Sequence, residues 1–159
     1  MKALVIYDSK SGNTEKMARA VAEGMASSKD IQVETKKVGE RFPLTLLAEA
    51  AVTVFGSPVI YADITHDLKN FLEKVESYVS ARKMNPKGKI AAVFGSYGYD
   101  GAFVMEAFLK KRLQKLGYKV LDTTCVETDN NIKYNPAALD NCRTFGRGVA
   151  EKAGKQKRA

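Results

Sequence analysis

The chain has 159 residues, of which 45% are hydrophobic and 28% charged, and this balance predicts one folded domain and excludes a disordered or fibrous chain. Lysine and arginine number 26 against 18 acidic residues, and the formal net charge of +8 keeps nucleic acid, an anionic membrane and an acidic protein open as partners. No apolar stretch approaches the roughly 18 residues of a membrane-spanning helix, and no signal-peptide pattern precedes the first strand, so we expect a cytoplasmic protein outside the membrane.

Strand-like and helix-like patterns alternate along the sequence, with short connections and no internal repeat. Short apolar runs predict buried strands, strict apolar–polar alternation predicts an edge strand, and apolar residues three and four apart predict helices. The expected order is strand 2–7, a helix through Met17 to Met25, edge strand 31–38, a short helix 44–50, strand 51–55, helix 68–79, strand 89–94, helix 104–116, strand 118–126 and a last helix from Pro136 to Val149.

Capping residues mark several of the expected helix ends. Asn13 or Thr14 is the expected N-cap of the first helix. Gly117 is the expected C-cap of the fourth. Before the last helix, Asn135 suits the N-cap and Pro136 the first helical position, where its missing N–H costs nothing.

Strict alternation of strands and helices predicts an α/β fold, a three-layer sandwich in which a five-stranded parallel sheet is covered on both faces. The buried first, third and fourth strands and the edge-like second strand favour the sheet order 2-1-3-4-5. In that order, ligands bind at the carboxyl ends of strands 1 and 3. We expect the domain to span residues 1–154, with a basic C-terminal tail at 155–159. Half of the excess positive charge lies after residue 146, which favours a solvated, frayed helix end over a binding arm.

Cysteine and histidine usage argues against a metal site. Cys125 and Cys142 form no C-x-x-C pair, and one histidine is too few for a Cys/His zinc cluster. Both cysteines lie at apolar-face positions, which favours buried, reduced thiols. We expect His66, the only histidine, to be exposed near the start of the third helix rather than to act as a proton donor.

The first of three loops with chemical content is Ser9-Lys-Ser-Gly-Asn-Thr14, which leads from the first strand into a helix. Hydroxyls, backbone N–H groups, a glycine at position 12 and the helix dipole suit a phosphate dianion. The loop lacks the Gly-Lys-Ser/Thr ending of a triphosphate loop, so we expect no Mg²⁺ chemistry. An ordinary capped turn is the alternative, and the position of the loop in the predicted sheet favours phosphate binding over it.

The loops after strands 3 and 4 predict a flat crevice beside this phosphate loop. Residues 95–101, Gly-Ser-Tyr-Gly-Tyr-Asp-Gly, nearly match the dinucleotide pattern G-x-G-x-x-G, with Asp122 about twenty residues on. The glycine spacing is wrong, however, and two tyrosines suit stacking on a flat ring better than clearance for a pyrophosphate. Exposed turn tyrosines are the alternative. Residues 56–63 bring an aliphatic pair and an aromatic to the same edge, and a phosphate socket beside a flat crevice is the shape of FMN.

These loops resemble the flavodoxin family, and look most like the flavodoxin-like domain of the flavodiiron (A-type) flavoproteins. Ser9–Thr14 fits the phosphate-loop pattern Ser/Thr-x-Ser/Thr-Gly-x-Thr, while Gly56-Ser-Pro58 and Lys87-Gly-Lys-Ile90 with Phe94-Gly-Ser-Tyr-Gly98 carry the resemblance to the A-type proteins. The resemblance covers essentially the whole chain and implies the flavodoxin-like fold. Flavodoxin with its FMN is a standard example of the strand order 2-1-3-4-5.

The resemblance also implies where FMN contacts this chain. The phosphate loop should hold the phosphate, the third-strand loop should pass the dimethylbenzene and N5 side, and the fourth-strand loop should cover the pyrimidine side, with Tyr99 first and Tyr97 second as the stacking residue. The implied contact residues are Ser9, Lys10, Ser11, Gly12, Asn13, Thr14, Ser57, Pro58, Val59, Ile60, Tyr61, Ser96, Tyr97, Gly98, Tyr99 and Gly101.

The resemblance has limits. With one histidine and this length, we expect no diiron centre, and the basic charge departs from the mostly acidic flavodoxins. The leading expectation is an FMN-binding flavodoxin-type electron carrier without a catalytic residue. An FMN-dependent NAD(P)H reductase acting on a quinone or other small acceptor is the alternative, so enzymatic activity stays open.

Partner expectations follow from the charge. A phosphoreceiver would need an aspartate where Phe55-Gly-Ser57 stands, and the basic residues of 110–115 lack the interleaved aromatics of a nucleic-acid site, so we expect neither role. The partners we expect are acidic redox proteins such as ferredoxin or rubredoxin, or an oxidoreductase, with docking that depends on salt.

Overall fold

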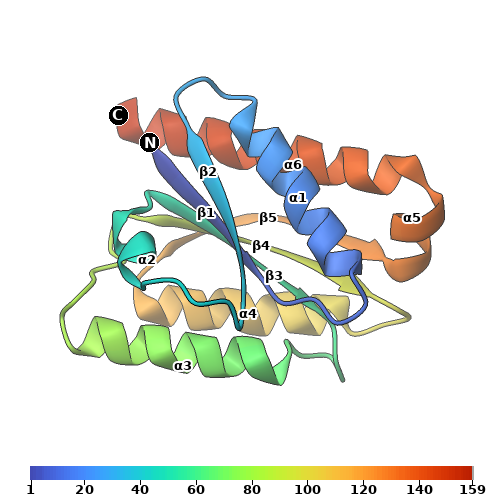
Figure 1. Ribbon diagram of the computed structural model, residues 1–159, viewed down its shortest axis with the longest axis horizontal. Helices are drawn as coiled ribbons and strands as arrows, with labels where there is room; N and C mark the ends of the chain where they lie inside the picture. The colour runs from blue at the N-terminus through green and yellow to red at the C-terminus, as the bar shows by residue number, and fades with distance from the viewer. Residues whose placement is uncertain (159) are drawn as a thin grey trace.

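In the computed structural model, which describes residues 1–158, strands and helices alternate around one central sheet (Figure 1). The strands are β1 (Lys2–Tyr7), β2 (Gln32–Lys37), β3 (Val52–Pro58), β4 (Ile90–Tyr97) and β5 (Lys119–Thr128). The helices are α1 (Asn13–Ala26), α2 (Thr45–Glu49), α3 (His66–Ser80), α4 (Ala102–Leu116), α5 (Asp129–Tyr134) and α6 (Pro136–Arg158).

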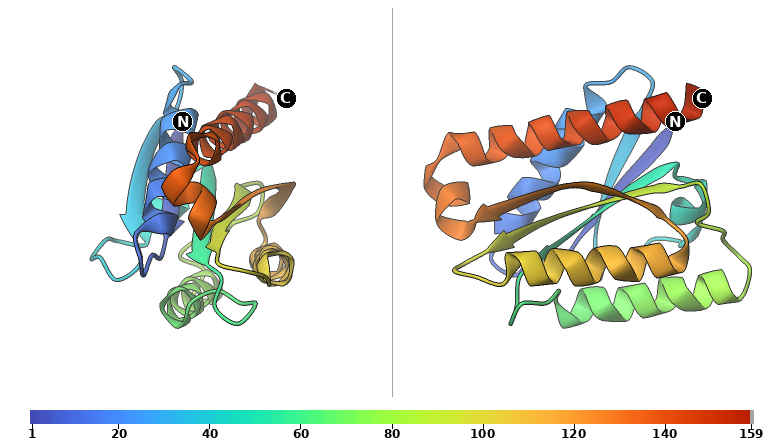
Figure 2. Two further views of the ribbon diagram at one scale, coloured as in Figure 1. Left: turned by 90° about the vertical axis from the view of Figure 1, so that its right-hand side faces the viewer. Right: turned by 180° about the vertical axis from the view of Figure 1, so that it is seen from behind.

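The sheet has the order β2-β1-β3-β4-β5, and every neighbouring pair is parallel. Helices α1 and α6 cover one face of the sheet, and α3 and α4 cover the other (Figures 1 and 2). The three-layer α/β fold and the strand order predicted from the sequence are therefore confirmed.

Two apolar cores result from the pleat of the strands, which points successive side chains to opposite faces. In β1, Val5 packs on the α1 and α6 side, and Leu4 and Ile6 pack on the α3 side. Each such buried aliphatic side chain contributes about 1.5–3 kcal/mol to stability. This double burial explains why the central strands are continuous apolar runs.

The largest difference from the sequence expectation is that β3 and β4 continue beyond their apolar runs. Pro58 still pairs with Ser96, and Tyr97 pairs with Thr128 of β5, so the ladder extends into the segments expected to be loops. Ser57 and Ser96 consequently lie buried on strand ends rather than in loops.

The helix ends agree with the sequence in part. Asn13 and Thr14 are the first helical residues of α1, so their assignment as N-cap was wrong; Gly12 is the N-cap because it adopts the left-handed conformation of that turn, with φ of 93°. Gly117 is the left-handed C-cap of α4, and the Asn135 side chain accepts from the N–H of Ala137 at the start of α6, as expected.

Helix α6 extends further than its apolar pattern. Residues 155–158, expected to belong to a basic tail, form its last turn, and Ala159 lies outside the described residues. Within residues 1–158, no helix is both long and apolar enough to cross a bilayer.

Candidate functional site

The three loops expected to bind a ligand meet at the carboxyl edge of the sheet. The N–H of Asp8, after β1, donates to the carbonyl of Gly56 in β3 at 3.1 Å. The N–H of Val59 donates to the carbonyl of Ser96 in β4 at 2.8 Å. The hydroxyls of Thr14 and Ser96, both buried, share a 2.7 Å hydrogen bond. The segments that follow β1 and β4 are therefore joined directly, because the parallel topology brings the carboxyl ends of these strands to the same edge.

The turn between β1 and α1 has the backbone of an anion site. Gly12 is the N-cap of α1 in the left-handed region, and as a glycine it has no side chain to cap the helix itself. The Ser9 hydroxyl accepts from the N–H groups of Gly12 (3.1 Å) and Glu15 (3.3 Å) and shapes the turn. Within the part of the chain that the structure describes, no protein acceptor receives the N–H groups of Ser11, Asn13 and Thr14. These donors, at the positive end of the helix dipole, fit a phosphate group.

Two side chains predicted to bind the phosphate are engaged elsewhere. The Asn13 amide donates to the carboxylate of Asp129, at the start of α5, at 3.0 Å. The Thr14 hydroxyl is paired with Ser96. In this structure both side chains hold the phosphate loop against neighbouring loops, and the N–H groups and the exposed Ser11 remain for a ligand.

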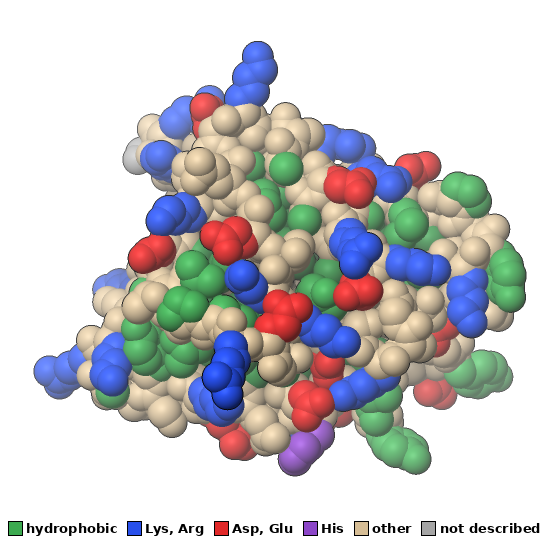
Figure 3. Space-filling model, in the orientation of Figure 1, with side chains coloured by type: hydrophobic (Ala, Val, Ile, Leu, Met, Phe, Trp, Pro, Cys, Tyr) green, Lys and Arg blue, Asp and Glu red, His purple; other side chains and the backbone are tan. Residues whose placement is uncertain are grey.

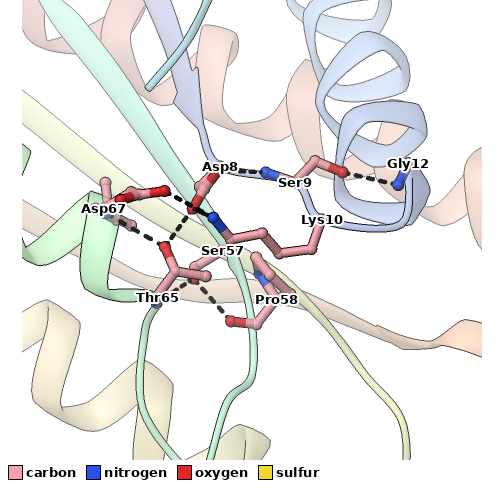
Figure 4. Close-up of polar contacts among 9 residues, drawn as sticks. Asp8, Ser9, Lys10, Gly12, Ser57, Pro58, Thr65 and Asp67 are labelled. Atoms are coloured by element: carbon pink, nitrogen blue, oxygen red, sulfur yellow. Dashed lines mark hydrogen bonds and ion pairs between the residues drawn. The ribbon is translucent and has the colours of Figure 1, made fainter. Parts of the chain in front are cut away.

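Lys10, the only cation of the phosphate loop, is matched by two carboxylates (Figure 4). Its ammonium lies 2.7 Å from Asp67 in the first turn of α3 and 3.3 Å from Asp8. The hydrogen bond to Asp67 raises the pKa of Lys10, and the same contact lowers the pKa of Asp67. These contacts tie the phosphate loop to α3. Because the two carboxylates balance the charge of Lys10, the attraction for an anion would come mainly from the backbone N–H groups of the turn.

A buried polar network that the sequence did not reveal supports the same edge (Figure 4). The Asp8 carboxylate accepts from the Thr65 hydroxyl at 2.6 Å and from the N–H of Ser9 at 2.8 Å. Thr65 is the N-cap of α3, and its own N–H donates to the Ser57 hydroxyl at 3.1 Å. A threonine before an apolar helical pattern could have identified Thr65 as a cap. No local signal could have identified the burial of Asp8, because its partner is 57 residues away.

The loops after β3 and β4 carry the aromatic side chains. Tyr61 is 99% exposed and Tyr99 is 93% exposed, and neither packs against another ring among residues 1–158. A Cβ on Gly101 would lie 2.9 Å from Ala62 Cα, so the two loops touch at this point. In this structure both are exposed turn tyrosines, the alternative that the sequence left open, and their ring faces are free to contact a ligand.

Tyr61 and Ala62 are the two non-glycine residues of the third-strand loop that adopt positive φ, at 48° and 62°. This conformation costs about 1–2 kcal/mol per residue for L-amino acids. Such strain is frequent at ligand sites, where the surrounding structure holds it. A short bridge between Ile60 and Asp63 closes the strained turn.

A large hollow lies next to this edge and not within it. It has a volume of about 690 Å³ and lies between residues 38–44 and α3. Asp67 lines it, but none of the predicted contact residues does. The predicted residues lie instead in the loops, strand ends and helix start at the rim of the sheet. His66 is exposed at the start of α3, as expected, and residues 1–158 contain no cluster of three metal-ligating side chains.

Comparison with known sequences and structures agrees with this geometry. The profile of the Flavodoxin family matches residues 5–146. A type A flavoprotein of Rhodobacter capsulatus is 31% identical over 153 residues, which is 93% of this chain and 32% of that protein. In three curated relatives the match takes in nearly all of this chain, but it spans only about a third of the relative's length.

Solved structures show the same fold. A flavodoxin from the domain Archaea superposes with a TM-score of 0.80 at 31% identity, covering 97% of this chain and 99% of that one. Rubredoxin oxygen:oxidoreductase from Desulfovibrio gigas superposes with a TM-score of 0.83 at 22% identity, covering 99% of this chain and 37% of that one. The first similarity extends over nearly the full length of both proteins.

Proposed function

The chain belongs to the flavodoxin family, and from this premise we propose that it is an electron carrier that exchanges electrons with separate redox proteins. Flavodoxins bind FMN and take part in electron transfer. Bound FMN supplies one- and two-electron redox chemistry.

One observation carries the proposal: the left-handed turn at Gly12, where the N–H groups of Ser11, Asn13 and Thr14 meet no acceptor within residues 1–158. Its uncommitted N–H groups fit a phosphate monoester, and the balanced Lys10 leaves them as the principal attraction. The Ser9 hydroxyl fixes the turn, and the Thr14–Ser96 bond fixes its distance from β4. The chain thus prepares the phosphate end of an FMN site before any ligand binds.

The loops after β3 and β4 would hold the ring. Tyr99 offers a free aromatic face, and Tyr61 with Pro58 to Ile60 offers the opposite wall. Stacking on such faces excludes water from one side of a flat ring and is worth about 0.5–1.5 kcal/mol beyond buried area. Backbone N–H groups of these loops would orient the polar edge of the ring.

We propose acidic redox proteins such as ferredoxin or rubredoxin, or an oxidoreductase, as partners. The net charge of +8 supports an acidic partner. One structural relative is named for rubredoxin, which supports that candidate. The basic charge is not accounted for by FMN, whose phosphate offsets only about two units.

Titration of the apoprotein with FMN, followed by quenching of flavin fluorescence, tests the proposal. We expect stoichiometric binding, and we expect Gly12→Ala to weaken it by about tenfold or more, because a left-handed alanine strains the turn. Gly88→Ala is the matched control: Gly88 also has positive φ and open space around it, but lies at the opposite end of β4.

Equal loss of affinity in both glycine variants, or an apoprotein that binds no FMN, would contradict the proposal. The reductase alternative is tested on the same sample. Rapid bleaching of the flavin absorbance by NAD(P)H alone would favour that alternative, and an unchanged spectrum would favour the carrier.

A further inference from the structure

Helix α4 exposes large apolar side chains on its outer surface, where a soluble helix is normally polar. Phe103 is 80% exposed, Phe108 61% and Val104 44%. At 3.6 residues per turn, Val104 and Phe108 lie one turn apart on an arc that faces away from the buried Met105, Leu109 and Leu113. Phe103 lies about 100° from Val104 around the helix, on the neighbouring flank. Together the three exposed side chains form a second, outer face of the helix, separate from the face that packs on the sheet.

This second face adjoins the proposed cofactor edge. Gly101, the N-cap of α4, contacts the third-strand loop at Ala62, so the apolar half of the helix begins where the two loops meet. Tyr99 and Tyr61, both almost fully exposed, lie in those loops. Figure 3 shows hydrophobic side chains standing out at the lower right, where Figure 1 places the loops after β3 and β4. The apolar docking face, as we name it, consists of Tyr61, Tyr99, Phe103, Val104 and Phe108.

The second half of α4 carries positive charge on the same arc. Lys111 and Lys115 are exposed there, and neither forms an ion pair within residues 1–158. By contrast, Arg112 is paired with Glu76 of α3 at 2.8 Å, and Lys69 is paired with Asp63 at 2.6 Å. In the described part of the chain, the uncommitted cations beside the apolar docking face are thus Lys111 and Lys115, and one uncommitted carboxylate, Asp100, lies next to Tyr99 at the other end.

A groove joins the apolar and the basic parts. It lies between α3 and α4, has a volume of about 560 Å³, and is lined by Ile64, Phe108 and Leu109 together with Lys111 and Lys115. Figure 2 shows the two helices side by side on one face of the sheet. A partner seated on α4 would therefore meet apolar side chains near the cofactor edge and lysines farther along.

We propose that this surface of α4 docks an acidic redox protein, whose own apolar patch covers Phe103 and Phe108 while its carboxylates meet Lys111 and Lys115. The proposal rests on the proposed function, because it places the partner beside the edge that would hold FMN. A second copy of the chain is disfavoured, since two copies of net charge +8 repel each other. Nucleic acid is disfavoured, since its binding relies on neutralising several phosphates, and this surface offers two free lysines beyond an apolar patch.

Two acidic probes test the surface: rubredoxin and plant-type ferredoxin, each added to the FMN-loaded, ¹⁵N-labelled protein. We expect amide shift changes over residues 99–115 at low salt. We expect the Phe103→Ser/Phe108→Ser double variant to weaken binding by about tenfold. Tyr134→Ser, at an aromatic residue 80% exposed on α5, is the matched control and should leave binding unchanged.

A second pair of variants separates the local charge from the net charge. Lys111→Glu/Lys115→Glu and Lys152→Glu/Lys155→Glu change the net charge equally, but the second pair is exposed on α6, across the sheet. We expect the first pair to weaken binding at least fivefold more than the second. All four altered side chains are exposed, so we expect every variant to fold.

Several outcomes would overturn the proposal: no shift changes with either probe, shift changes confined to α1 or α6, or equal loss of affinity in the two lysine pairs. Concentration-dependent dimerisation through α4, or a single-stranded oligonucleotide that displaces the probes at physiological salt, would also overturn it. The FMN titration is a separate measurement. If the protein fails to bind FMN, the shift experiment is made on the apoprotein, and probe binding to α4 would then reject the proposed function and leave the docking surface in place.

Discussion

Thr65 connects three segments of the carboxyl edge through one residue. Its hydroxyl donates to Asp8 at 2.6 Å and accepts from the N–H of Leu68 at 3.2 Å, while its own N–H donates to Ser57. We expect Thr65→Ala to lower the free energy of unfolding by about 1–2 kcal/mol, because α3 loses its cap and a buried carboxylate loses a donor. Urea unfolding followed by circular dichroism measures this change.

Thr45→Ala is the control for this substitution. Thr45 is an exposed threonine at the start of α2 whose side chain makes no hydrogen bond among residues 1–158, and its replacement should change stability by less than about 0.5 kcal/mol. Similar small effects in both variants would contradict the assigned role of Thr65.

Tyr7 predicts how stability depends on alkaline pH. Burial and the 2.9 Å hydrogen bond that its hydroxyl donates to Glu15 raise the pKa of Tyr7 to about 12. In the unfolded chain a tyrosine titrates near pH 10. Between about pH 10 and 12 the unfolded state has therefore lost a proton that the folded state keeps, and stability falls as pH rises, by up to about 1.4 kcal/mol per pH unit.

We expect Tyr7→Phe to show a shallower loss of stability in this pH window and no change in slope below about pH 9. Burial also raises the pKa of Tyr118, so part of the alkaline loss remains in the variant, and the difference from the wild type is the quantity to measure. Urea unfolding at several pH values gives it. Identical slopes for the two proteins would reject this account of Tyr7.

At the next level of organisation, α1 and α6 approach each other closely through two glycines. A Cβ on Gly24 would lie 2.0 Å from the carbonyl oxygen of Arg143, and a Cβ on Gly146 would lie 2.2 Å from that of Val21. The layer that supports the phosphate loop from behind therefore depends on the absence of two side chains. Figures 1 and 2 show the two helices lying against each other.

We expect Gly146→Ala to lower the free energy of unfolding by about 2–3 kcal/mol, because the methyl group would force the helices apart. Gly148→Ala, two residues along the same helix with nothing within 4 Å of its Cβ, should raise it by up to about 1 kcal/mol, since alanine favours helix. Thermal and urea unfolding measure both. A destabilised Gly148→Ala, or an unaffected Gly146→Ala, would contradict the packing described.

The helices and strands differ in how well their sequence predicts them. Continuous apolar runs predicted the central strands, and the alternating pattern of residues 31–38 predicted an edge strand. The strand order followed from this difference, because a strand's residue types show whether one or both of its faces are buried. The ends of β3 and β4 were missed because pairing such as Pro58 with Ser96 depends on the neighbouring strand. Helix α5 was missed because it has six residues and buries only Ile132, too few for a periodic pattern.

The site shows the same division between local and distant determinants. The sequence placed Ser9 to Thr14 at a helix start near the sheet edge, and the structure confirms that position. It did not predict that Asn13 is held by Asp129, or that Lys10 is balanced by Asp8 and Asp67, since those contacts join residues far apart in sequence. The phosphate loop was therefore predicted as a motif, but its electrostatic balance required the fold.

That balance bears on the charge of the protein as a unit. Carboxylates offset Lys10 locally, so the net charge of +8 comes from the other Lys and Arg residues, and it would attract an acidic partner during approach. Bound FMN would offset about two of these charges, so the loaded protein stays strongly basic.

We expect the rate of electron transfer to an acidic ferredoxin to fall about tenfold or more as ionic strength rises from about 0.01 M to 0.5 M, because salt screens the attraction that speeds encounter. Stopped-flow mixing of the reduced, FMN-loaded protein measures the rate. A basic c-type cytochrome as acceptor is the control, and its rate should rise over the same range as repulsion is screened. If both acceptors gave flat profiles, the basic surface would have no part in partner encounter, and the excess charge would need another explanation.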